Sequence, residues 1–325
     1  MQLLALMTFG FLLTRFWGWS ADFFRGLSRF IIKIALPLYF FTKISVLQPE
    51  AMREGLLFPL GAVVIVGCGL VGSWLFFRFF PASAAERRAC VALSGFGNSG
   101  YLPLMLIEIF PLTLPMLAET FGSEIPALYV GAYLLVQNPL LWTVGNFLVT
   151  GRERKPRLRD LLTPPLIGIL CGLLMSLSGA GRIFMELSYP GYHIYRALER
   201  VAQTTFPLIL LTLGSMIANI NFSRGLKGGV VRLALGVLAF RFLLMPLLFL
   251  GGYFLVLARI GLLPPQIWVL FLESHLPPAT NLSVMAAQAG KNEDLVSLSI
   301  LITYLAYLLF LPLFLLVFLN LPGLL

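Results

Sequence analysis

The 325-residue sequence is 59% hydrophobic and only 11% charged, with a mean hydropathy of +0.92. Soluble domains are roughly 25% charged, so this chain would expose apolar patches over the whole surface of a soluble globule. The same values exclude a disordered or fibrous protein. We therefore expect an all-α, polytopic membrane protein.

The charge balance is basic, with 23 Lys and Arg against 14 Asp and Glu and a formal net charge of +9. The basic residues lie in short gaps between apolar runs, where they orient the chain and contact head groups of the lipid bilayer. We therefore expect no nucleic-acid partner. The cysteines lack the spacing of a metal site or a disulfide framework, so we expect neither; they are Cys68, Cys90 and Cys171.

About ten apolar runs are long enough to cross a hydrocarbon core of about 30 Å as helices. Helices are expected because the runs are longer than barrel strands and lack strict alternation. The first run is short and has no signal-peptide cleavage site, which indicates a clipped or tilted first helix. The runs cover residues 1–17, 28–47, 56–80, 89–117, 125–149, 161–178, 198–220, 230–258, 266–289 and 295–320.

Lysine and arginine are concentrated in alternate loops, most densely at residues 151–160. The positive-inside rule places these loops in the cytoplasm. Both termini are then expected outside the cytoplasm, in a multi-pass protein of the plasma membrane or bacterial inner membrane.

The two halves of the chain share a weak internal repeat. Pro37 is followed by Thr42, and Pro207 is followed at the same spacing by Thr212. Five spans per half is an odd number, so the second half enters the membrane from the opposite side, as in many secondary transporters. This predicts a first five-helix repeat at residues 1–150, a cytoplasmic basic loop at 151–160 and a second, inverted repeat at 161–325.

Two of the predicted spans, the fourth and the ninth, contain helix-breaking residues at membrane depth. Residues 95–103 read GFGNSGYLP and residues 273–281 read ESHLPPATN. Proline lacks a backbone donor and clashes with the preceding turn, and glycine lowers helix preference. Broken helices at matching positions of two half-repeats indicate a substrate site. Each break exposes the start of a half-helix, near Leu104 and Pro278, whose unpaired N–H groups favour an anion.

These segments resemble the auxin efflux carrier family, which includes plant auxin exporters and bacterial permeases described as malate or malonate carriers. The resemblance covers nearly the whole chain and is most specific at the two broken segments. It also includes the following short motifs: Leu36-Pro37, Gln137-Asn138, residues 163–168 (TPPLIG) and residues 287–290 (AQAG). The brief loop at 151–160 differs from the long loops of many plant exporters, so auxin itself is not the expected substrate.

The family resemblance implies that the fourth and ninth helices cross at their prolines. Helices 1, 2, 6 and 7 would form a scaffold, and helices 3–5 and 8–10 a moving transport unit. The resemblance also implies that Asn98, Gln137 and Asn138 line the substrate site. Together with the broken segments, it predicts a substrate-binding site that consists of Asn98, Ser99, Gly100, Tyr101, Pro103, Gln137, Asn138, Pro277, Pro278, Thr280 and Asn281.

Ionisable residues within the apolar runs are costly and commonly functional. Arg241 lies about a dozen residues into the eighth run, while Glu108, Glu273 and His275 flank the two breaks. One interpretation is a structural ion pair between Arg241 and a glutamate. The other is a proton-coupling group, either a buried glutamate or His275. Nothing in the sequence indicates a cofactor or metal, and the coupling ion is either H⁺ or Na⁺, if there is one.

We expect a secondary transporter that carries a small organic anion, a carboxylate, by alternating access. A channel or a non-transporting receptor of the same fold is the alternative. An intramembrane hydrolase built from Ser274, His275 and Glu108 is disfavoured, because adjacent helical side chains point about 100° apart. The expected partners are the substrate and the bilayer, and a homodimer is one of the oligomeric states that the sequence allows.

Overall fold

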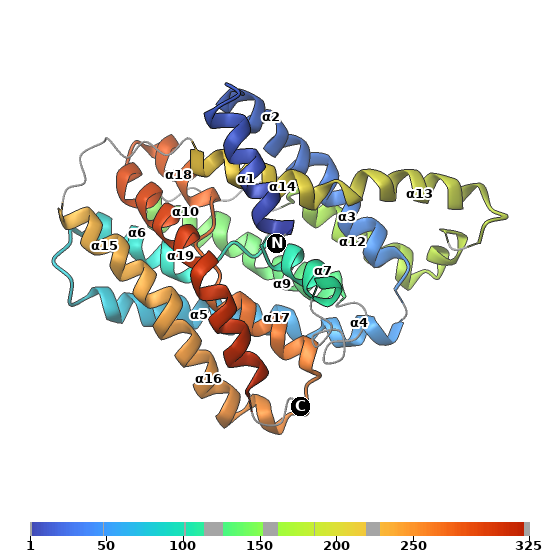
Figure 1. Cartoon of the computed structure of the whole chain (residues 1–325). Helices are drawn as coiled ribbons and strands as arrows, with labels where there is room; N and C mark the ends of the chain where they lie inside the picture. Colours follow the sequence, from blue (N-terminus) through green and yellow to red (C-terminus); the bar gives the residue numbers. More distant parts are fainter. Residues whose placement is uncertain are drawn as a thin grey trace. The chain divides into compact units, whose positions relative to one another are not determined.

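A computed structural model describes residues 2–47, 49–100, 102–113, 126–151, 162–184, 186–218 and 228–321. Every named element within these ranges is helical (Figure 1). Four helices of the described part are long and apolar enough to cross a membrane: Met52–Phe77, Ala127–Thr150, Gly228–Arg259 and Glu293–Leu319. Ala5–Arg15 and Pro164–Leu177 are shorter apolar helices. Tyr101 and almost all of the basic loop at 151–160 lie outside the described residues.

The chain divides into two compact units, of which the first comprises Met1–Leu56, Pro126–Gly131 and Leu162–Arg224. The elements of the first unit are α1 (Gln2–Arg15), α2 (Ala21–Phe30), η1 (Ile31–Ala35), α3 (Leu36–Ser45), α4 (Pro49–Gly55), α12 (Pro164–Leu177), η3 (Ala180–Phe184), α13 (Pro190–Gln203) and α14 (Thr205–Ala218).

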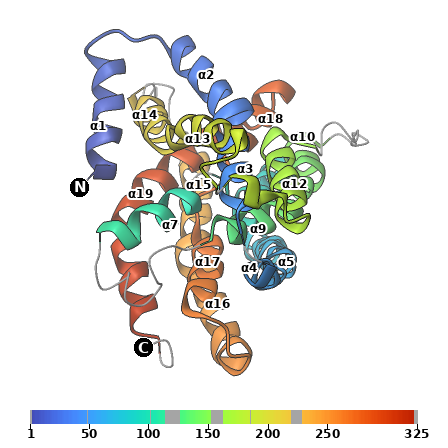
Figure 2. The ribbon, with the colours of Figure 1, turned by 90° about the vertical axis from the view of Figure 1, so that its right-hand side faces the viewer.

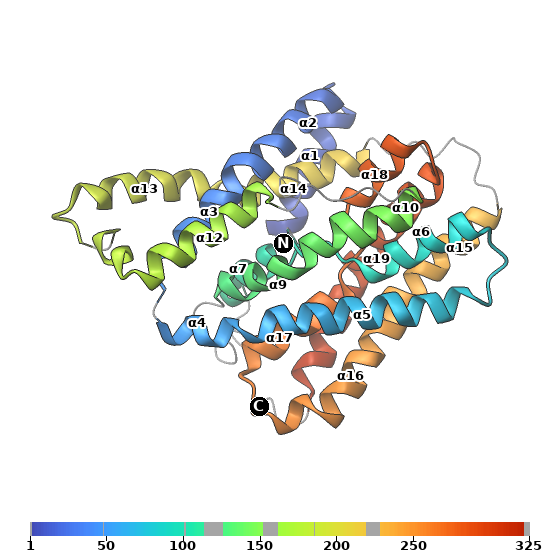
Figure 3. The same cartoon turned by 180° about the vertical axis from the view of Figure 1, so that it is seen from behind.

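Within the first unit, α1 packs along α14 and α12 packs along α3 (Figures 1 and 3). Both contacts depend on glycine. A Cβ atom added to Gly10 would lie 2.1 Å from the carbonyl oxygen of Leu211, and one added to Gly168 would lie 2.2 Å from that of Pro37. Small residues of this kind allow membrane helices to approach closely.

Helix α13 begins at Pro190, eight residues before the apolar run predicted at 198–220. It is amphipathic, with Arg196 and Arg200 exposed and Tyr195 buried. The Tyr195 hydroxyl donates to the carbonyl of Thr42 over 2.9 Å, which attaches α13 to α3. Hydropathy alone misses such a helix because only one of its faces is apolar.

The second unit comprises Leu57–Ile125, Ala132–Leu161 and Gly225–Leu325. Its elements are α5 (Leu57–Phe77), α6 (Ala84–Gly95), α7 (Leu102–Thr113), most of α9 (Ala127–Leu140), η2 (Leu141–Gly145), α10 (Asn146–Thr150), α15 (Gly228–Ala239), η4 (Phe240–Leu244), α16 (Met245–Leu255), η5 (Leu257–Arg259), α17 (Pro264–His275), α18 (Asn281–Ala289) and α19 (Glu293–Leu319).

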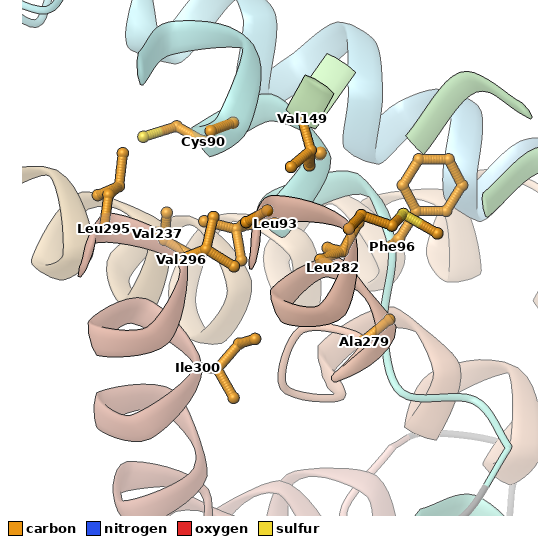
Figure 4. Close-up of a cluster of buried hydrophobic side chains, with 14 of the residues drawn as sticks. Cys90, Leu93, Phe96, Val149, Val237, Ala279, Leu282, Leu295, Val296 and Ile300 are labelled. Carbon is orange, nitrogen blue, oxygen red and sulfur yellow. The ribbon is translucent and has the colours of Figure 1, made fainter. Parts of the chain in front are cut away.

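In this unit α15 lies beside α19 (Figure 1), α16 beside α17 (Figure 2) and α5 beside α6 (Figure 3). A core cluster joins α6, α10, α15, α18 and α19, and Figure 4 shows its side chains between these helices. The outer face of α19 is aliphatic, and Leu309 is 80% exposed there with Leu313 and Leu316 along the same stripe. Such a stripe is suited to lipid rather than to water, as expected for a membrane protein.

A π-helical segment, η4, interrupts the long helix from α15 to α16. Pro246 follows it and has no N–H to donate to the carbonyl of Phe242. The wider π turn accommodates this lost bond, and such turns are frequent at functional sites. The segment contains Arg241, which it directs into the interior of the unit.

Candidate functional site

Two helices of the second unit are interrupted at the positions that the sequence predicts. Helix α6 ends at Gly95 and α7 begins at Leu102, while α17 ends at His275 and α18 begins at Asn281. Pro103 occupies the first turn of α7, where its missing N–H has no helical partner to lose. The interruptions therefore follow from local sequence.

The two interruptions cross and pair with each other. The amide of Asn98 donates to the carbonyl of Pro277 over 2.8 Å, and the amide of Ala279 donates to that of Phe96 over 2.9 Å. Gly97 and Pro278 thus form an isolated antiparallel bridge. This pairing satisfies backbone groups that would otherwise be unpaired in a membrane interior. We call residues 96–100 and 276–280 the crossing.

The pairing corrects one sequence-based expectation. The N–H groups at the start of α18 were expected to be unpaired, but Leu282 donates to Ala279 over 3.1 Å and Ser283 donates to Thr280 over 3.1 Å. A tight turn at the helix start uses these donors, so this helix terminus has fewer N–H groups to offer to an anion.

Burial divides the predicted substrate residues into an inner and an outer group. The inner, buried group consists of Asn98, Ser99, Pro103, Gln137, Pro277 and Pro278. The outer, half-buried group consists of Gly100, Asn138, Thr280 and Asn281. The outer group offers the larger surface to a ligand in this conformation. Tyr101 lies outside the described residues.

Two buried amide side chains, those of Gln137 and Asn98, donate hydrogen bonds at the crossing. Gln137 donates through Nε2 to the carbonyl of Gly97 over 2.7 Å, and its Oε1 has no hydrogen-bond partner. Asn98 donates through Nδ2 to the hydroxyl of Tyr304. Each amide nitrogen carries two N–H groups, so Asn98 retains a second donor for a substrate carboxylate.

Arg241 lies against the crossing with an exposed fraction of 1%. Its Nη1 donates to the carbonyl of Ser94 over 3.1 Å, whereas Nε and Nη2 have no hydrogen-bond partner. A Cβ atom added to Gly97 would lie only 2.3 Å from Nη2. Glycine at position 97 is therefore what allows the guanidinium to reach the crossing.

Glu273, in the last turn of α17, is also 1% exposed, and neither of its carboxylate oxygens has a hydrogen-bond partner. It interacts electrostatically with Arg241 and lies close to the Ser99 side chain. The structure thus brings Glu273 and Arg241 into one polar cluster. Glu108 lies on α7 and is half-buried.

His275 and Ser274 do not form the arrangement of a hydrolase. The His275 ring packs on Phe271 and Phe314, with ring centroids 4.6 and 4.0 Å apart, and neither ring nitrogen has a hydrogen-bond partner. The Ser274 hydroxyl donates to the carbonyl of Phe271 over 2.6 Å. It is therefore occupied within its own helix rather than activated by the histidine.

Sequence reasoning missed three tyrosines at this site. Tyr133 on α9 and Tyr304 and Tyr307 on α19 interact electrostatically with Arg241. Each lies within a long apolar run, where a phenol seeks a hydrogen-bond partner. That mid-span position was the available signal, but tyrosine is too common in membrane helices to stand out without the tertiary contacts.

The chain matches a family model described as "Membrane transport protein" over residues 1–158 and 153–315. It is 31% identical to Protein PIN-LIKES 7 of Arabidopsis thaliana over 154 residues, which cover 46% of this chain and 38% of the plant protein. With PIN-LIKES 5 of the same plant it shares 30% identity over 50% of this chain and 41% of the relative. The alignments thus span less than half the length of these plant relatives.

A longer alignment links the chain to a Rhizobium meliloti (strain 1021) protein named "Putative malonate transporter". The two are 26% identical over 307 residues, which cover 92% of this chain and 88% of the relative. An uncharacterized transporter of Methanothermobacter thermautotrophicus is 25% identical over 96% of this chain and 95% of its own length. The chain therefore belongs to the membrane transport protein family of the auxin efflux carriers, whose members are named as transporters rather than as enzymes.

Proposed function

We propose that this protein is a secondary transporter that carries a small organic anion by alternating access, with its substrate site formed by Asn98 at the crossing and the outer group of residues. The observation that carries the proposal is the pairing of two interrupted helices, which brings amides and two half-helix starts together within an apolar unit. The relative named for malonate makes a short dicarboxylate the first substrate to test.

The same proposal includes two inverted five-helix repeats, residues 1–150 and 161–325. In such a repeat the first helix corresponds to the sixth and the second to the seventh. Helices 1, 2, 6 and 7 contain α1, α3, α12 and α14, respectively. Helix 1 packs on helix 7 in the same way as helix 6 packs on helix 2, and this equivalence supports the repeat. The division into units supports a scaffold of helices 1, 2, 6 and 7 and a transport unit of helices 3–5 and 8–10.

The proposed topology predicts which side of the membrane each loop occupies. In a background without Cys68, Cys90 and Cys171, the variants Thr120→Cys and Ile260→Cys should react with an impermeant thiol reagent added from outside. Arg154→Cys should react only after the membrane is permeabilised. Labelling of Arg154→Cys in intact cells would reverse the orientation and place both termini in the cytoplasm.

The substrate site is tested by removing its amides. Asn98→Ala and Asn281→Ala should each weaken the binding of radiolabelled malonate by about 10- to 150-fold, because a hydrogen bond to a charged group contributes roughly 1.5–3 kcal/mol. Purified protein in a scintillation proximity assay gives the dissociation constants. Asn320→Ala is the matched control, since Asn320 is exposed and donates to Leu316 at the end of α19.

If Asn98→Ala and Asn281→Ala both bind malonate as tightly as the wild type, the crossing is only structural. Proteoliposomes then separate the classes of function: a carrier exchanges internal for external malonate with saturation, a channel shows linear flux and a receptor shows none. If the wild type does not bind malonate, a thermal-shift screen over dicarboxylates, amino acids and aromatic acids identifies the anion, because a bound ligand raises the melting temperature.

A further inference from the structure

Unsatisfied polar atoms are concentrated around the crossing of the second unit. Among the described residues, buried side-chain atoms there without a hydrogen-bond partner belong to Ser94, Ser99, Gln137, Arg241, Glu273, His275 and Tyr307. Buried polar groups are nearly always paired, so such a set calls for a functional explanation. It includes one permanent cation, Arg241, and one carboxyl group with both oxygens unpaired, Glu273.

The surroundings of Glu273 indicate its protonation state in this conformation. An ionised carboxylate inside a protein is stabilised by two or three N–H or O–H donors or by a directly paired cation. Glu273 accepts no hydrogen bond with good geometry and has no directly paired cation, and a single hydroxyl, that of Ser99, lies near it. The carboxyl group is therefore neutral here and carries a proton.

Arg241 provides the partner for the ionised form. Its guanidinium is charged at all physiological pH values, and its Nε and Nη2 are without acceptors. Loss of the proton from Glu273 would create an anion that interacts electrostatically with this guanidinium, and a side-chain rearrangement would pair the two groups. The cluster thus has two charge states. With Glu273 protonated, two donors of Arg241 stay unpaired, and with Glu273 ionised the two groups can form an ion pair.

These two states differ in net charge at the crossing, where Arg241 lies against Gly97 and Glu273 lies near Ser99. With Glu273 protonated, the charge of Arg241 is uncompensated and favours an anion at the crossing. With Glu273 ionised, the ion pair is neutral and this attraction is lost. Proton and anion therefore favour each other's binding, and the coupling is reciprocal.

We propose that Glu273 is the proton-binding group of this transporter and that one proton is bound and carried together with each substrate anion. This inference rests on the proposed function and assigns H⁺ as the coupling ion. The groups that face Glu273 are Arg241 from η4, Ser99 from the crossing, Tyr133 from α9 and Tyr307 from α19. His275 lies on the same helix, two residues further on.

The first experiment measures malonate binding as a function of pH in purified wild-type protein and in two isosteric variants. In the wild type, the dissociation constant should rise by about tenfold per pH unit above the titration of Glu273, because one proton is bound with each anion. In Glu273→Gln the affinity should stay at its acidic value, apart from the protonation of malonate itself. Glu293→Gln, at an exposed position in the first turn of α19, is the matched control and should keep the wild-type pH dependence.

Proteoliposomes give the transport counterpart of this measurement. An inward proton gradient should drive malonate accumulation in the wild type and in Glu293→Gln. In Glu273→Gln it should not, although malonate exchange continues, because the amide can no longer carry the proton. Accumulation driven by the proton gradient in Glu273→Gln would overturn the inference.

A substrate-free measurement separates this inference from the proposed function. Infrared spectroscopy of the wild type should show the carbonyl band of a protonated, buried carboxylic acid that disappears at alkaline pH and is missing from Glu273→Gln. The absence of that band would overturn the proton site even if malonate is transported. Its presence in a protein that neither binds nor transports malonate would support the proton site and refute malonate as the substrate.

Discussion

Gly97→Ala is expected to destabilise the protein and to abolish transport. The new methyl group would lie 2.3 Å from Nη2 of Arg241 and 3.1 Å from Cβ of Leu276. The guanidinium would have to shift within a fully buried site, which strains its bond to Ser94, and Leu276 would have to give by a few tenths of an ångström. Overpacking costs about 1–3 kcal/mol and a charged hydrogen bond about 1.5–3 kcal/mol. The melting temperature in detergent and malonate uptake measure the two effects.

Two further variants show whether the clash with Arg241 is the cause. Gly100→Ala is the control for stability, because a Cβ atom there would meet no atom within 4 Å. The double variant Gly97→Ala/Arg241→Met removes the guanidinium from the path of the methyl group and should recover much of the lost stability. A double variant as unstable as Gly97→Ala would place the clash elsewhere, at Leu276 or in the backbone bridge to Pro278.

Arg241→Met should abolish transport while leaving the melting temperature near or above that of the wild type. Arg241 is fully buried but makes one hydrogen bond, and two of its three nitrogens have no acceptor. Each unsatisfied buried donor costs about 1–3 kcal/mol, and apolar replacement of buried charges is often neutral or stabilising. We therefore expect that Arg241 is needed for transport and that its buried charge lowers the stability of the folded protein. Thermal unfolding and malonate uptake by the same preparation test both parts.

The result can contradict this interpretation in two ways. Wild-type uptake by Arg241→Met would show that the fixed charge is not needed for transport. A collapse of the melting temperature would instead show that Arg241 mainly stabilises the crossing through Ser94. Arg241→Lys separates charge from geometry, because lysine keeps the positive charge but not the planar set of donors.

Local sequence determined much of this protein. Long apolar runs indicated membrane helices because burial in lipid depends on the length and hydrophobicity of each segment alone. The interruptions at residues 96–101 and 276–280 were likewise predictable, since proline and glycine weaken a helix wherever it packs. The same reasoning identified Arg241 and Glu273 as costly groups at membrane depth. It missed the start of α13, whose polar face hides it from a hydropathy search.

Only the tertiary structure decided what these local features contact. The substrate role predicted for Gln137 and Asn98 stays a prediction, whereas their contacts within the protein come from the fold. Gln137 donates to Gly97, and Asn98 donates to Tyr304, more than two hundred residues away along the chain. The bridge between Gly97 and Pro278 uses the N–H groups of Asn98 and Ala279, and the turn that starts α18 uses others that were expected to be free. The bonds from Asn98 to Tyr304 and Pro277 and from Ala279 to Phe96 join segments from opposite halves of the sequence, because a backbone donor inside a membrane needs an acceptor that the fold brings within reach. Composition and spacing therefore determined that the helices break and where, whereas long-range packing decided that the breaks meet and that Arg241 lies between Ser94 and Gly97.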